Sequence, residues 1–66
     1  MLESTILEAI KKHAEGNIAL HSANIEVYLA NPAGIGEHSD IMEAIQGELD
    51  EISKHSDRLE AIATYF

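Results

Sequence analysis

The stretch Asn31-Pro-Ala-Gly-Ile-Gly-Glu-His-Ser-Asp40 decides the fold of this chain, because it is the one break between two long segments with helical periodicity. Pro32 lacks a backbone N–H and disfavours helical angles in the residue before it, so a helix that approaches it ends near Asn31. Gly34 and Gly36 let the backbone turn back on itself. Two amphipathic helices joined by one turn predict an antiparallel helical hairpin.

The segment before the break predicts a helix at about residues 3–30. At about 100° per residue, its hydrophobic residues form a stripe and an adjoining flank that together cover about half of the circumference. The stripe contains Leu7, Ile10, Ala14, Ile18, Ile25, Tyr28 and Leu29, and the flank contains Leu2, Ile6, Leu20 and Val27. Because the stripe stays in phase across Gly16, the helix is expected to run unbroken; the alternative is a C-cap at Gly16-Asn17 that splits it in two. One neighbouring helix cannot cover so wide a sector.

The segment after the break predicts a second helix at about residues 40–65, which leaves residues 31–39 as the connector. Its apolar stripe consists of Ile41, Ile45, Leu49, Ile52, Leu59, Ile62 and Phe66. Asp40 followed by Glu43 matches a capping box, with Ser39 as the alternative N-cap.

The chain has 66 residues, which make a single domain at 1–66, below the size at which one core readily offsets the conformational entropy of the chain. It contains no cysteine, so neither a disulfide nor a thiolate zinc site adds stability. Self-association is then the expected source of further buried area. The predicted fold class is all-α: a two-helix antiparallel hairpin that pairs with a second copy into an antiparallel four-helix bundle.

The net charge of −8, from four Lys+Arg against twelve Asp+Glu, limits the classes of partner. Such a surface repels the phosphates of nucleic acids and the head groups of anionic membranes. The start Met1-Leu-Glu-Ser-Thr5 has no pattern of a signal peptide, and no apolar run has the length of a membrane span. A cytoplasmic protein that binds neither nucleic acid nor membrane is expected.

Several polar side chains interrupt the apolar sides of both helices. They are His13, Asn17, His21 and Asn24 in the first helix, and Glu48 and His55 in the second. When the helices fold back around Gly34, residues whose numbers add up to about 69 lie level with each other. This places His21 near Glu48, and His13 near His55 or Ser56. We interpret these residues as polar layers that fix register and oligomeric state; the alternative is partial exposure at the edge of the oligomer.

The same region allows an alternative function, a metal ion or small ligand bound between the helices. The candidate ligands are His13, His21, Glu48, Glu51 and His55. Glu51 and His55 are four residues apart on one face, and Glu48 lies one turn earlier. The Glu-x-x-His step of the di-iron bundles is absent, however. No nucleophile or oxyanion hole accompanies a His–Glu pair, so we assign no catalytic residue and no cofactor, and an enzyme is not expected.

The glycines of the connector also invite comparison with loops that bind phosphate. Gly34 and Gly36 lie ahead of a helix N-terminus, where backbone N–H groups attract anions. No lysine or arginine lies in the connector or the next turn, and Glu37 and Asp40 would repel an anion. A tight inter-helix turn is therefore the favoured interpretation.

The run Asn24-Ile-Glu-Val-Tyr-Leu-Ala-Asn-Pro-Ala-Gly-Ile-Gly-Glu-His-Ser-Asp-Ile41, followed by an acidic helix that ends in Tyr65-Phe66, resembles short helical proteins of large tailed bacteriophages, marine ones among them. The specific part is Asn-Pro-Ala-Gly-Ile-Gly-Glu-His. The resemblance implies a small accessory protein of viral origin in the cytoplasm of a host cell, and it transfers no functional residue. We expect an acidic interaction protein that acts as a homodimer or higher oligomer and covers the basic surface of a host protein.

Overall fold

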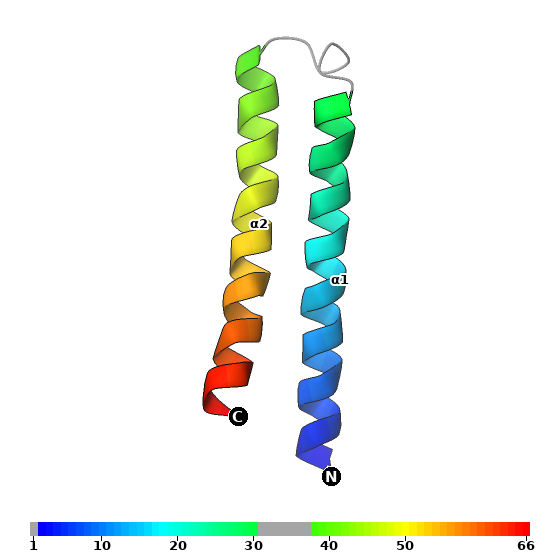
Figure 1. Cartoon of the computed structure of the whole chain (residues 1–66), viewed down its shortest axis with the longest axis vertical. Helices are drawn as coiled ribbons and strands as arrows, with labels where there is room; N and C mark the ends of the chain where they lie inside the picture. The colour runs from blue at the N-terminus through cyan, green and yellow to red at the C-terminus, as the bar shows by residue number, and fades with distance from the viewer. Residues whose placement is uncertain (1, 31–37) are drawn as a thin grey trace.

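The computed structural model describes residues 2–30 and 38–66, and both elements of secondary structure in these ranges are α-helices. Helix α1 spans Leu2–Ala30 and helix α2 spans His38–Tyr65. The two helices pack against each other and run in opposite directions, so that the start of α1 and the end of α2 lie at the same end of the molecule (Figure 1). The predicted all-α pair of packed helices is confirmed.

Both helices begin slightly before their predicted starts. Helix α1 continues through Gly16 without a break, as the phase of its hydrophobic residues predicted. The predicted N-cap of the second helix was wrong, because α2 begins at His38 and therefore contains Ser39 and Asp40. Asp40 lies in the first turn, where the helix dipole favours a carboxylate. The connector glycines at 31–37, with their proposed turn, fall outside the described residues.

The interface between the helices is built from one stripe of each. Its buried or half-buried residues include Leu7, Ala14, Ile18, His21, Ile25 and Tyr28 of α1, and Ile41, Ile45, Glu48, Ile52, His55, Leu59 and Ile62 of α2. These positions recur at steps of three or four residues, or of seven, as expected for helices that present one face to a neighbour. Within the described residues, Ala14 is the one hydrophobic side chain with no solvent exposure, at 0%.

The buried stripes are narrower than the sequence predicted. Four residues assigned to them are exposed: Ile10, Leu29, Leu49 and Phe66. The first three lie at the edges of their stripes, beyond the reach of a single neighbouring helix, and Phe66 follows the end of α2. The flank of the first helix is also uncovered, since Ile6, Leu20 and Val27 are exposed. The prediction that one neighbour leaves part of the apolar sector open is confirmed.

The molecule is a thin rod with extents of 50 × 15 × 11 Å. Its radius of gyration is 15.2 Å, whereas a compact domain of this length has about 10.8 Å. A rod only two helices wide has one interface between its helices and no enclosed core. Neither α1 nor α2 combines the length and the hydrophobicity needed to cross a bilayer.

Candidate functional site

The carboxylate of Glu48 joins the two helices through side-chain hydrogen bonds. Its Oε1 accepts from Nδ2 of Asn24 at 2.9 Å and lies 2.7 Å from Nδ1 of His21, both on α1. Because an ionised carboxylate can only accept, the proton of His21 lies on Nδ1 in this contact. The side chains of His21 and Glu48 are each 17% exposed. The predicted proximity of His21 and Glu48 is confirmed.

These hydrogen bonds also decide the ionisation of Glu48. The hydrogen bond from Asn24, and then that from His21, lower the pKa of Glu48 below its ordinary value of 4.5, and burial opposes them. Glu48 is therefore ionised at neutral pH and bonded to two turns of α1 at once. This arrangement fixes the register of the helices, which is the structural role expected of a polar layer.

A second polar cluster lies nearer the open end of the hairpin. The rings of His13 and His55 meet edge to face, with centroids 5.9 Å apart and planes inclined at 65°. Nδ2 of Asn17 donates to the backbone oxygen of His13 at 2.8 Å and lies 3.3 Å from its ring Nε2. The predicted contact between His13 and His55 is confirmed.

His55 is buried among these residues, with 4% exposure, and its Nδ1 has no hydrogen-bond partner. Burial lowers the pKa of His55 below its ordinary 6.5; the positive charges of Lys54 and Arg58 add to this effect, and Glu51 opposes it. The neutral imidazole is thus the form that the folded hairpin favours. An unpaired buried nitrogen is a local cost to stability that the sequence did not reveal.

Exposed ion pairs occupy the outer surfaces. The carboxylate oxygens of Glu8 lie 3.5 Å from Nζ of Lys11 and 3.7 Å from Nζ of Lys12. Glu8 and Lys12 form an i,i+4 pair in the favourable order, with the glutamate first. Glu51 lies 3.0 Å from Lys54, which lowers the pKa of Glu51 below 4.5. Such exposed pairs contribute little to stability.

The candidate metal ligands do not come together in one place. His21 lies with Glu48, His13 lies with His55, and Glu51 pairs with Lys54. In residues 2–30 and 38–66, no group of three or more His, Cys, Asp or Glu side chains is placed to hold a metal ion. The geometry favours two structural polar layers over a metal centre.

Two of the shallow grooves on the described part of the surface carry no recognisable chemistry. The first, of about 300 Å³, is at the open end and is lined by Leu7, Glu8, Lys11, Leu59, Ile62, Ala63 and Phe66. The second, of about 310 Å³, follows the end of α2 and is lined by Asp57, Glu60, Ala61, Thr64 and Tyr65. Neither groove includes a member of the two polar clusters.

Asn24 is the residue whose role sequence reasoning missed. It stood out as a polar residue on an apolar side, but its hydrogen bond to Glu48 was not predicted. The available signal was its position one turn after His21, which places both side chains on the same face of α1.

Comparison of the chain with protein-family models, with curated proteins and with solved structures finds no match.

Proposed function

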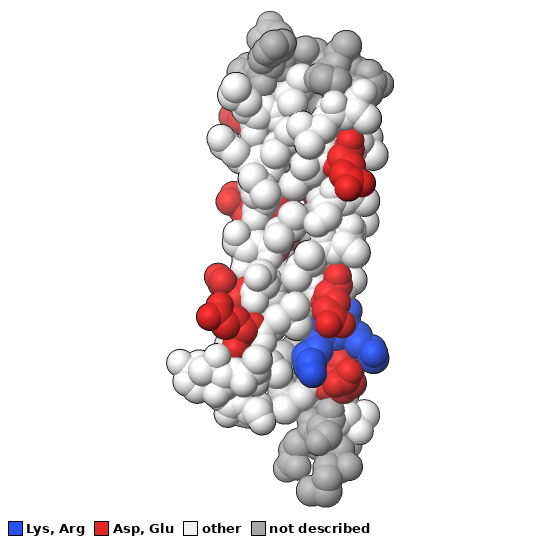
Figure 2. All heavy atoms as spheres, in the orientation of Figure 1, with Lys and Arg blue, Asp and Glu red and all other residues white. Residues whose placement is uncertain are grey.

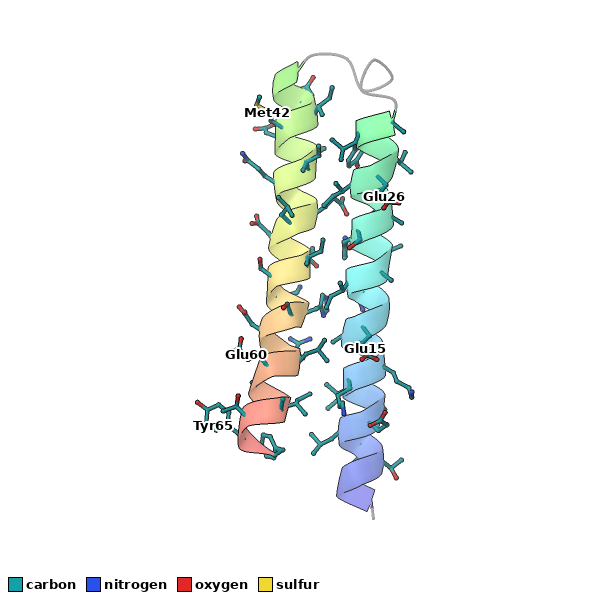
Figure 3. The ribbon with its side chains drawn as sticks, viewed as in Figure 1. Glu15, Glu26, Met42, Glu60 and Tyr65 are labelled. Carbon is teal, nitrogen blue, oxygen red and sulfur yellow. The ribbon has the colours of Figure 1, made fainter. Side chains whose placement is uncertain are left out.

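We propose that this chain is a self-associating interaction protein whose hairpins pair into a four-helix bundle with an acidic outer surface. The observation that carries this proposal is the hydrophobic surface that a single hairpin leaves uncovered. Nine large hydrophobic side chains of the described residues are exposed: Ile6, Ile10, Leu20, Val27, Leu29, Met42, Leu49, Tyr65 and Phe66. Met42 and Tyr65 project from the side of α2 that faces away from α1 (Figure 3).

The total surface area supports the same conclusion. The hairpin exposes 4926 Å², whereas a compact monomer of 7.2 kDa is expected to expose about 4,100 Å². The excess is about 800 Å², which is close to the area that each partner contributes to a protein interface of standard size. One second copy therefore suffices to bring the exposed area to that of an ordinary folded protein.

We expect sedimentation equilibrium at micromolar concentration to give about 14 kDa, twice the chain mass of 7.2 kDa. The melting temperature should rise with protein concentration, since folding and association are then linked. A compact species of 7.2 kDa that melts cooperatively and independently of concentration would show that the proposal is wrong.

The charge of the outer surface indicates the class of partner. Glu43, Asp50 and Asp57 recur every seven residues and are exposed along one line of α2. A basic protein surface matches this line and the net charge of −8. The resemblance of residues 24–41 to bacteriophage proteins supports the proposal that such a partner is a protein of an infected bacterium.

A variant in which the three carboxylates of this line are neutralised, with Glu43→Gln, Asp50→Asn and Asp57→Asn, tests this proposal. At low salt, the wild-type protein should retain basic proteins from a bacterial lysate and release them as the salt concentration rises. The triple variant should retain clearly less of the same proteins while its mass in solution stays that of the wild type. Equal retention by both proteins would exclude this acidic line as a binding surface.

A further inference from the structure

Helix α1 carries a second series of residues beside the one that packs on α2. Its members are Ile6, Ile10, His13, Asn17, Leu20, Asn24 and Val27, which we call the uncharged seam. They recur at alternating steps of four and three residues, the spacing of a helix that packs along another helix. Each member except Ile10, which precedes Lys11, immediately precedes a residue of the interface with α2. The seam therefore lies about a quarter of a turn from the interface with α2.

No carboxylate, lysine or arginine interrupts the uncharged seam, and two of its members, His13 and Asn24, also contact His55 and Glu48 of α2. Ile6, Leu20 and Val27 of the seam are 51%, 56% and 65% exposed. Small exposed residues follow one of its edges every seven positions: Ala9, Gly16, Ala23 and Ala30. A Cβ added at Gly16 would meet no atom within 4 Å. A neighbouring helix can thus approach closely along the whole seam.

We infer that the seam is covered by the same seam of a second copy, in antiparallel orientation, with the two-fold axis beside Asn17. This inference rests on the proposed self-association and adds the surface and the orientation that produce it. In this register Ile6 lies level with Val27 of the partner subunit, and His13 lies level with Leu20 of the partner subunit. A quarter-turn between two contact stripes is what each helix of a square four-helix bundle requires.

The distribution of charge selects the antiparallel orientation. Residues 18–50, the half of the hairpin next to the connector, carry six carboxylates and no lysine or arginine. Residues 1–17 and 51–66 carry the other six carboxylates and all four basic residues, a net charge of −2. On the face seen in Figure 2, basic atoms appear only over α1, in the half near the chain ends. A parallel pair would place the two halves of charge −6 side by side, and an antiparallel pair places each beside a half of charge −2.

Helix α2 supports the same orientation independently. Its series one quarter-turn from α1, on the same side of the hairpin as the seam, contains Ala44, Gly47, Glu51, Lys54, Arg58 and Ala61. In the antiparallel register, Glu51 lies level with Lys54 of the partner subunit, and Ala44 lies level with Ala61 of the partner subunit. A parallel two-fold pair of the same seams would instead place the two copies of α2 on opposite sides, so only the antiparallel pair brings Glu51 beside Lys54 of the partner subunit.

The surface is tested with a matched pair of substitutions on α1. Leu20→Glu places a carboxylate in the seam, and Leu29→Glu places the same group at a similarly exposed leucine outside it, at 63% exposure. We expect Leu20→Glu to weaken the dimer by about 100-fold or more, because two charges are buried near the axis. Leu29→Glu should weaken it by less than about threefold. Sedimentation over a range of concentrations measures both constants.

The orientation is tested by disulfide formation, because the chain has no cysteine of its own. Ile6→Cys and Val27→Cys are made separately and oxidised mildly, alone and as an equal mixture. We expect a 6–27 disulfide between the two variants in the mixture, identified by its mass, and little crosslinking of Ile6→Cys alone. Only an antiparallel pair brings these positions within the 4.4 to 6.8 Å, roughly, that a disulfide spans between Cα atoms.

The outcomes separate this inference from the proposed function. Efficient crosslinking of Ile6→Cys with itself would overturn the antiparallel orientation. A wild-type dimer that withstands Leu20→Glu and yields no 6–27 disulfide would overturn the seam as the interface and leave self-association standing. A monomeric wild-type protein would overturn both. Because crosslinking uses variants without an added charge, it remains decisive even when Leu20→Glu unfolds.

Discussion

Replacement of Ala14 by lysine is expected to destabilise the hairpin by about 3 kcal/mol or more. Ala14 has no exposed surface, so the longer side chain forces the helices apart or leaves an ammonium group without solvent. A domain of this length has a total stability of only about 3–10 kcal/mol. We therefore expect Ala14→Lys to lose most of its cooperative melting transition, as followed by circular dichroism.

Ala19 provides the matched control for this substitution. It lies in the same helix and is exposed, so Ala19→Lys changes the composition and net charge in the same way. Lysine is a good helix former, and the expected change is within about 0.5 kcal/mol. Similar melting curves for the two variants would contradict the close contact of the helices at Ala14.

Acidification is expected to destabilise the protein in two steps. The pKa of His55 is lowered by burial, so between its ordinary value of 6.5 and its folded value the unfolded chain binds a proton that the folded chain does not. The contribution of His55 to the free energy of unfolding is therefore fully present above pH 6.5. It decreases as the pH falls through this window. Below 4.5 a second loss follows, because hydrogen bonds from Asn24 and His21 lower the pKa of Glu48 in the folded state.

His55→Leu separates the first step from the second. It removes the unpartnered Nδ1 and places an apolar side chain in the same buried position. Urea unfolding at a series of pH values, in high salt to screen the net charge, should show no loss near pH 6 for this variant and an unchanged loss below pH 4.5. A wild-type protein whose unfolding midpoint is constant between about pH 7 and 5 would contradict the proposed role of His55.

The contacts between the helices were predictable where simple helix geometry decides them. The proline and glycines of the break placed the turn, and level positions then paired His21 with Glu48 and His13 with His55. This works because two straight antiparallel helices advance at the same rate per residue. The continuation of α1 through Gly16 followed from phase alone, although glycine costs about 1 kcal/mol relative to alanine there.

The details that were missed depend on the direction in which each side chain points, which must be known to within a few tens of degrees around the helix axis. Leu29 and Leu49 belong to the apolar sectors by periodicity, yet one neighbour does not reach them. Asn24 reaches Glu48 because its side chain lies over the preceding turn of α1, toward His21. The start of α2 at His38 was missed because local residue signals place a helix end only to within one or two residues.

The two packed helices form a single layer, so the hairpin is only one α-helix thick. Water therefore borders both broad sides of the interface in a lone hairpin, where the side chains of His21 and Glu48 are still 17% exposed. Covering one broad side of the rod removes that nearby water. The contribution of the same polar groups to stability therefore depends more on association with another molecule than on the folding of the chain itself.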